Sequence, residues 1–271
     1  MNSKQRVIIT GSSGFIGSAL YKYLKKNNIP CHGISRSNSE FTDTIVNNYQ
    51  KVISMNDGNS LLINLAGSNT LVSDEEVDLI RLLSKSYKDK MIFISSAQVY
   101  GSRFIKPISE IQDISTIKNY AKSKIFLETE TINNNGMVLR LSNIYGKGMS
   151  EKNIFNKIYS QILQNQNNIL IQNITAIRDY LYIDDLCEIF MKIILGKVQN
   201  KIFNVGTEIG TDVLTLVKHI ADHLNYTNNK VNIISEENYQ DSIILDTSLL
   251  RRSYDWTPKV IIKEGIQKWL N

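Results

Sequence analysis

The sequence predicts an α/β fold: a doubly wound parallel sheet with a smaller C-terminal cap. Apolar strand candidates alternate with helical patterns through the first half of the 271 residues, which is typical of parallel strands joined by crossover helices. In addition, the first strand candidate leads directly into Gly11, Gly14 and Gly17, spaced Gly-x-x-Gly-x-x-Gly at the start of a helix. This strand–turn–helix context is typical of the first crossover of such a sheet.

The elements of the first half follow in order. Residues 15–26 carry Ile16, Ala19, Leu20, Tyr23 and Leu24 at helical spacing. Between residues 36 and 60 the pattern is short and its strand stays ambiguous. Apolar runs predict strands, and periodic or capped segments predict helices, with these bounds: strands at 7–10, 30–35, 60–67, 91–96 and 137–142; helices at 15–26, after a Ser73–Glu76 capping box, and at 120–131.

After Gly146 the pattern changes to a helix at 153–163, a strand at 169–172, a helix from 182, a strand at 201–206 and a helix at 213–224 capped by Thr211 or Asp212. Only three prolines occur, and no Gly/Ser tract separates the halves. We therefore expect a dinucleotide-binding domain at 1–146 and a substrate-binding cap at 147–271 that packs on it and is partly interleaved with it.

Composition excludes several classes of protein. The net charge of +5 is spread without a basic tract, so nucleic-acid binding is not expected. No apolar run reaches the roughly 20 residues of a membrane span. Cys31 and Cys187 are the only cysteines, and the His219/His223 pair lacks a third ligand, so no metal site is expected. The sequence predicts a cytoplasmic protein.

The glycine loop predicts the binding of a dinucleotide. Its glycines allow a tight turn and a close approach of the backbone to a pyrophosphate at the helix N-terminus. NAD-binding chains usually place an acid about 20 residues on, to hold the ribose 2′-hydroxyl. Here that place reads Ile34-Ser35-Arg36-Ser37, and the guanidinium of Arg36 suits a 2′-phosphate. NADP(H) is therefore favoured, and NAD(H) remains an alternative.

Two further groups of residues predict chemistry: one pair for acid–base catalysis and one strand end for substrate binding. Tyr120 and Lys124 are four apart and share one face of a helix. A phenol titrates near pH ~10 in water, and the neighbouring cation brings it toward neutrality. Ser95 and Ser96 end a strand, where an open α/β sheet forms its ligand crevice, so Ser96 is expected to hydrogen-bond a substrate oxygen. Together with the glycine loop, these residues predict a dehydrogenase centre.

Nearly the whole chain resembles the extended short-chain dehydrogenase/reductases, specifically the NAD-dependent epimerase/dehydratase family and its sugar-nucleotide branch. The segments that carry the resemblance are Thr10-Gly-Ser-Ser-Gly-Phe-Ile-Gly17, Asn64-Leu-Ala-Gly67, Ser95-Ser-Ala-Gln-Val-Tyr-Gly101, Tyr120-Ala-Lys-Ser-Lys124, Leu139-Arg-Leu-Ser-Asn-Ile-Tyr-Gly146, Arg178-Asp-Tyr-Leu-Tyr-Ile-Asp-Asp185, Phe203-Asn-Val-Gly206 and Trp256-Thr-Pro258 before Glu264-Gly265.

The resemblance implies a Rossmann-type fold and a nucleotide-diphosphate sugar as substrate. It implies Ser96, Tyr120 and Lys124 as the catalytic residues. With the glycine loop, the expected cofactor-binding residues are Gly11, Ser13, Gly14, Phe15, Ile16, Gly17, Arg36, Ala66, Gly67, Tyr120 and Lys124. The expected substrate-binding residues are Ser96, Ala97, Gln98, Asn143 and Arg178, the last two at the diphosphate. A homodimer through the helices around 77–84 and 120–131 is also implied.

The residues that follow Ser96 decide between the chemistries of this branch. Members that eliminate water carry an Asp-Glu pair there, because β-elimination needs a separate acid and base; this chain has Ala97 and Gln98. Epimerases keep a tightly held NAD with the acidic ribose anchor, which is absent. We therefore expect an NADPH-dependent reductase of the 4-keto group of a nucleotide-linked deoxyhexose. A nucleotide-sugar 4-epimerase is the alternative, and a non-catalytic cofactor-sensing protein a third interpretation.

Overall fold

A computed structural model gives the structure of the chain. It describes residues 5–48, 50–67, 73–101, 106–114, 119–164, 168–226, 232–237 and 241–271. Within these ranges, the side chains of residues 119, 120, 168, 232, 233 and 235–237 lie outside the description.

The main layer is a seven-stranded parallel sheet with the strand order β10-β6-β5-β4-β1-β2-β3. Its strands are β1 (Val7–Thr10), β2 (Cys31–Ser35), β3 (Thr44–Ile45), β4 (Leu61–Asn64), β5 (Met91–Ser96), β6 (Met137–Leu141) and β10 (Ile202–Val205). The order reverses between β1 and β4, which is where a doubly wound sheet opens its ligand crevice. The predicted Rossmann-type fold is confirmed.

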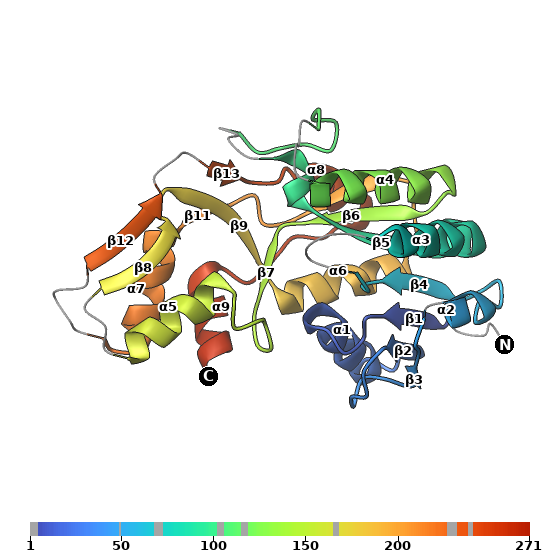
Figure 1. Cartoon of the computed structure of the whole chain (residues 1–271), viewed down its shortest axis with the longest axis horizontal. Helices are drawn as coiled ribbons and strands as arrows, with labels where there is room; N and C mark the ends of the chain where they lie inside the picture. Colours follow the sequence, from blue (N-terminus) through green and yellow to red (C-terminus); the bar gives the residue numbers. More distant parts are fainter. Residues whose placement is uncertain are drawn as a thin grey trace.

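Helices cover both faces of this sheet (Figure 1). They are α1 (Phe15–Lys26), α2 (Gln50–Ser54), α3 (Asp74–Tyr87), α4 (Asn119–Asn133), α6 (Ile183–Leu195) and α8 (Ser248–Tyr254), with short 3₁₀ turns η1 (Lys88–Lys90) and η2 (Ala97–Tyr100). Successive side chains of a strand point to opposite faces. Accordingly, Val7 and Ile9 belong to the core shared with α1 and α6, whereas Ile8 belongs to the core shared with α3 and α4.

The C-terminal cap lies beside the carboxyl ends of the main strands, at the left of Figure 1. Its central strand β9 (Ala176–Tyr182) pairs with β7 (Asn143–Tyr145), β11 (Gly210–Asp212) and β13 (Asp241–Ile243). A separate parallel pair is formed by β8 (Asn168–Asn173) and β12 (Asn232–Glu237). The cap helices are α5 (Ile154–Leu163), α7 (Val213–His223) and α9 (Ile262–Leu270).

The chain passes back into the first layer after residue 147. Strand β10 pairs with β6 at the edge of the main sheet, and α6 packs beside α1. Both segments belong by sequence to the expected cap. The division into 1–146 and 147–271 therefore stays a prediction, and the contacts of these two elements cut across it.

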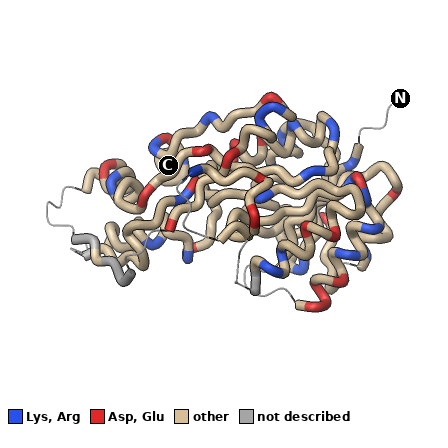
Figure 2. Tube along the Cα trace, turned by 90° about the horizontal axis from the view of Figure 1, so that it is seen from above, with Lys and Arg blue, Asp and Glu red and all other residues tan. Residues whose placement is uncertain are grey.

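Charged residues of both signs are scattered along the trace of both parts (Figure 2). No helix in the described part of the chain has the length and apolar character to cross a membrane.

A buried ion pair fastens α4 to the main sheet. Arg140 of β6 and Glu128 of α4 are each 2% exposed. The guanidinium donates to both carboxylate oxygens, with Nη2 to Oε2 at 2.6 Å and Nε to Oε1 at 3.0 Å. Ser95 of β5 donates its hydroxyl to the same carboxylate at 2.5 Å. The cost of removing two such charges from water is offset by their mutual attraction and by their hydrogen bonds.

The cost of breaking this pair is our first prediction. We expect Glu128→Ala to lower the free energy of unfolding by about 3–5 kcal/mol, because it leaves the Arg140 charge buried without its partner. The matched control is Glu130→Ala, on the same helix as Glu128. It removes the partly exposed ion pair of Glu130 with Arg81 of α3 and should lower the free energy of unfolding by about 0–1 kcal/mol. Urea unfolding of the three proteins measures both values, and equal losses would contradict the account.

Candidate active site

The glycine loop forms a cradle at the end of β1. Gly11 has φ +69, and a Cβ atom there would lie 2.9 Å from the backbone nitrogen of Ala66. A Cβ atom on Gly17 would overlap the carbonyl oxygen of Gly11, so α1 packs directly on the loop. Gly14 is the N-cap of α1, and the first turn carries no acidic residue. This helix N-terminus suits the pyrophosphate of a dinucleotide.

A large cavity of about 760 Å³ opens beside this cradle. It brings together three predicted cofactor residues, Arg36, Ala66 and Gly67, with the first turns of α3. Its other lining residues are Asn47, Asn48, Gln50, Asn64, Ser73, Glu75, Glu76, Asp78, Leu79, Ile80 and Leu82. The volume lies within the range of about 300–1,000 Å³ that is usual for ligand sites.

Hydroxyl groups and a guanidinium occupy the end of β2. Ser13 Oγ lies 2.5 Å from Ser35 Oγ and accepts from Ser37 Oγ at 3.1 Å, while Arg36 is exposed and lines the large cavity.

The two acids that follow β2 are engaged elsewhere. Glu40 lies 3.9 Å from Lys22. Asp43 accepts from the Gly33 amide at 2.8 Å and from the Tyr21 hydroxyl at 3.1 Å. Neither acid lines the large cavity.

A second, small cavity of about 120 Å³ contains all five predicted substrate residues: Ser96, Ala97, Gln98, Asn143 and Arg178. Ser96 ends β5, and its Oγ accepts from the Gln98 amide at 3.2 Å. Gly101, Leu141, Ser142, Asp241 and Ile243 complete the lining. The volume is below the usual range for a whole drug-sized ligand, so it suits one end of an extended molecule.

Arg178 is oriented by Asp241, a residue that the sequence did not point to. Its Nη2 pairs with the Asp241 carboxylate, and its Nη1 donates to the Asp241 carbonyl at 2.7 Å. Asp241 is the only carboxylate among the described residues that line the small cavity. The acid in this cavity is thus already matched by a cation.

Lys124 lies on α4, and its Nζ lies near Gly67, a residue that lines the large cavity. Its side chain is 7% exposed, and Nζ lies 5.1 Å from the centre of the Phe93 ring. Burial lowers the pKa of Lys124, and the carboxylates of Glu76 and Glu128 act in the opposite direction. Tyr120 is the second residue of α4, one turn before Lys124, and its side chain lies outside the described residues.

The buried Glu128–Arg140 pair continues the face of α4 that carries Tyr120 and Lys124, because Glu128 follows Lys124 by four residues. From Arg140 the network runs on to the Tyr100 hydroxyl at 2.9 Å, and from there to Asn204 Oδ1 at 2.7 Å. Neither Glu128 nor Arg140 was among the site residues expected from the sequence. The spacing of Tyr120, Lys124 and Glu128, each four residues apart, was the sequence signal that could have indicated Glu128.

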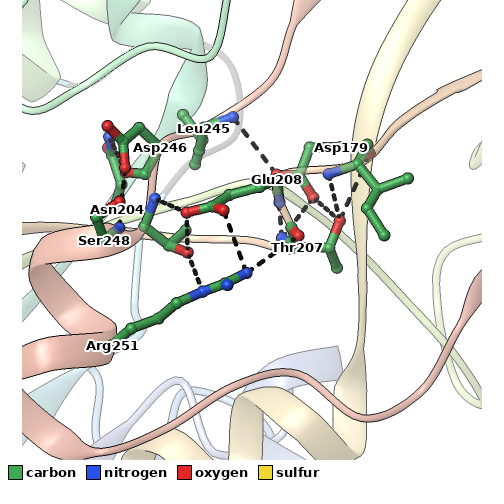
Figure 3. A network of polar contacts seen from close by, with 10 residues as sticks. Asp179, Asn204, Thr207, Glu208, Leu245, Asp246, Ser248 and Arg251 are labelled. Atoms are coloured by element: carbon green, nitrogen blue, oxygen red, sulfur yellow. Dashed lines mark hydrogen bonds and ion pairs between the residues drawn. The ribbon is translucent and has the colours of Figure 1, made fainter.

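Asp179 holds the strand that carries Arg178. Its carboxylate accepts from the amide and hydroxyl of Thr207, at 2.9 and 2.7 Å, and from the amides of Glu208 and Leu245 (Figure 3). Burial raises the pKa of Asp179, and these hydrogen bonds oppose the rise. A Cβ atom on Gly206 would overlap this carboxylate.

Glu208 extends this network to α8. It accepts from Thr247 and pairs with Arg251 at 3.4 Å (Figure 3). The contacts of Asp179 and Glu208 therefore join β9, the turn after β10 and the start of α8.

Comparisons with known proteins agree with this geometry. The model of the NAD dependent epimerase/dehydratase family matches residues 7–206. A putative UDP-glucose 4-epimerase of Methanocaldococcus jannaschii is 25% identical, covering 98% of this chain and 97% of the relative. A dTDP-4-dehydro-6-deoxyglucose reductase of Escherichia coli is 26% identical, covering 98% and 96%.

Among solved structures, a dTDP-glucose 4,6-dehydratase of Bacillus anthracis in complex with NAD superposes with a TM-score of 0.83 at 16% identity, covering 98% of this chain and 95% of that one. This likeness concerns the fold. The family match covers most of the chain and confirms the resemblance inferred from its motifs: the chain belongs to the NAD-dependent epimerase/dehydratase family.

Proposed function

We propose that this enzyme is an NADPH-dependent reductase of the 4-keto group of a nucleotide-linked deoxyhexose. The observation that carries the proposal is the chemistry of the small cavity. Ala97 and Gln98 follow Ser96, and neither ionises. The single carboxylate in the described lining, Asp241, is paired with Arg178. A β-elimination needs an acid and a base of its own, and the described residues that line this cavity supply no carboxylate besides this paired one.

The proposed mechanism uses Ser96, Tyr120 and Lys124. A dinucleotide held by the glycine loop would supply the hydride for the ketone carbon. Ser96 donates a hydrogen bond to the ketone oxygen and orients it. Tyr120 protonates that oxygen as the alkoxide forms, and Lys124 favours the phenolate that remains. Asn143 and Arg178 bind the diphosphate of the substrate.

The cofactor residues proposed here are the glycine loop (Gly11, Ser13, Gly14, Phe15, Ile16 and Gly17) together with Arg36, Ala66, Gly67, Tyr120 and Lys124. The preference for NADPH rests on Arg36 and on the hydroxyls of Ser13, Ser35 and Ser37. These groups are donors for a 2′-phosphate, whereas Glu40 and Asp43 are engaged away from the large cavity. The structural relative named above binds NAD, so NAD(H) is the competing cofactor.

A 4-epimerase is the second candidate, because the Methanocaldococcus jannaschii relative is named a putative UDP-glucose 4-epimerase and the match covers 97% of its length. An epimerase must retain and reoxidise its cofactor within one turnover, whereas the proposed reductase exchanges it. The two candidates therefore differ in net NADPH consumption.

The cofactor preference gives the second prediction. The unmodified protein should bind NADPH more tightly than NADH, as measured by fluorescence titration. Arg36→Ala should weaken NADPH by about 10- to 100-fold and leave NADH nearly unchanged, since a hydrogen bond to a charged group contributes about 1.5–3 kcal/mol. Arg36→Lys keeps the charge and loses the planar guanidinium. Its affinity for NADPH should lie between those of the unmodified protein and Arg36→Ala. Equal affinities of the unmodified protein for both cofactors would refute the preference.

The chemistry gives the third prediction. NADPH should be oxidised stoichiometrically with reduction of an already dehydrated nucleotide 4-keto-6-deoxyhexose, and the parent nucleotide hexose should not react. Tyr120→Phe should lower kcat by about 10²–10⁴-fold through loss of the acid and leave cofactor affinity intact. Formation of a 4-keto product from the parent hexose would indicate a dehydratase. Interconversion of C4 epimers without net NADPH oxidation would indicate the epimerase.

We also propose that the protein is a homodimer through α3 and α4. Phe126 of α4 is a large apolar residue with 40% exposure, and the guanidinium of Arg81 of α3 lies over its ring at 5.3 Å. A cytoplasmic location stays a prediction from the sequence.

Sedimentation equilibrium tests the dimer, which is the fourth prediction. The unmodified protein should be dimeric at micromolar concentration, and Phe126→Glu should shift it to monomer because a charge would be buried in the interface. Leu195→Glu is the control, since Leu195 is 69% exposed at the end of α6. A monomeric unmodified protein would contradict the proposal.

A further inference from the structure

Lys124 is a buried cation with carboxylates from two different elements acting on it. With 7% of its surface exposed, it has lost most of its hydration, which disfavours its charged form. Among the described side chains, Glu76 of α3, Glu128 of α4 and the Phe93 ring of β5 act on it. Of the two carboxylates, Glu76 has the larger effect on the pKa of Lys124, and both raise it.

The charge of Glu128 is already matched within the sheet. Its two oxygens accept three hydrogen bonds from Arg140, at 2.6, 3.0 and 3.2 Å, and a fourth from Ser95. Glu128 thus shares its charge with Arg140, and Glu76 is the carboxylate with the larger effect on the pKa of Lys124.

Glu76 is placed at the cofactor side of Lys124. A Cβ atom built on Gly67 would lie 3.0 Å from Glu76 Oε1 and 3.5 Å from Lys124 Nζ, so both charged groups border the space beside this glycine. Gly67 and Glu76 both line the large cavity. A side chain at residue 67 would occupy this space beside the carboxylate and the ammonium.

The fold of α3 fixes this position. Ser73 is the N-cap, and its Oγ accepts from the Glu76 amide at 3.2 Å, as the predicted capping box requires. Glu76 is thus the third residue of the helix, where the N-terminal end of the helix dipole stabilises a carboxylate. Asp74 shares this first turn but is exposed and does not line the cavity.

We propose that Glu76 is a positioning residue that keeps the Lys124 ammonium charged and directs it toward the large cavity, where it serves the cofactor and Tyr120. The role of Lys124 in this statement rests on the proposed function. In the proposed reduction Tyr120 works beside a cation, so Glu76 acts on the reaction through Lys124 and not by contact with the substrate.

The titration of Lys124 itself tests this inference without any substrate. In protein labelled with ¹³C at the lysine ε carbons, with Lys124→Met to assign the signal, Glu76→Gln should lower the midpoint of the Lys124 titration by about 1 pH unit or more. Glu76→Asp keeps the charge, so the midpoint of the Lys124 titration should stay close to that of the unmodified protein. Asp74→Asn removes a charge from the same helix turn and should leave it unchanged. An unchanged Lys124 midpoint in Glu76→Gln would overturn the proposal, as would an equal shift in Asp74→Asn.

A second readout separates this inference from the proposed function. In Glu76→Gln, the alkaline limb of the kcat profile for NADPH oxidation should move to lower pH, because Lys124 loses its proton earlier. If the Lys124 signal shifts but no nucleotide 4-keto sugar oxidises NADPH, the proposed function fails and the role of Glu76 stands. If turnover occurs and neither the titration nor the alkaline limb moves, the role of Glu76 fails and the function stands.

Discussion

The buried pair of Arg140 and Glu128 is the interaction on which the site depends. It joins β6 to α4, and Ser95 ties β5 to the same carboxylate. Because Ser96 follows Ser95, and Lys124 precedes Glu128 by one helical turn, the pair fixes the strand and the helix that carry the proposed catalytic residues. Removal of either partner would leave an uncompensated buried charge, which is strongly destabilising.

The two cavities lie at different places along the carboxyl edge of the sheet. The large one continues from the glycine cradle between β1 and β4 and offers Arg36 at its far end. The small one lies after β5 and β6, with Arg178 reaching in from the cap. Glu76 lies in the first turn of α3, and both its carboxylate and the Lys124 ammonium lie near Gly67, which lines the large cavity. In the proposed function, Arg36, Lys124 and Arg178 are the cations for cofactor choice, proton transfer and the diphosphate.

Much of this arrangement follows from local sequence. The strand before Gly11, helix α1 and strand β5 end where their apolar periodicity and turn residues predict, because each is fixed by neighbours in the chain. The five expected substrate residues line one cavity, and two of them, Asn143 and Arg178, were expected from the family resemblance. The partners Asp241 for Arg178 and Glu208 for Arg251 are far apart in sequence, and only the tertiary fold selects them. Strand β3 and helix α2 were ambiguous because they are short and carry few apolar residues to set a period.

The central claim is that a hydride passes from NADPH to C4 of a nucleotide sugar and that the cofactor then leaves. NADPH carrying deuterium at C4 of the nicotinamide, prepared with the label on either face, tests it directly. With one of the two labels, mass spectrometry and NMR of the product should find one deuterium at C4 of the sugar for each NADPH oxidised. A reduced sugar without deuterium from either label, or C4 epimers formed while the labelled NADPH remains intact, would contradict the account.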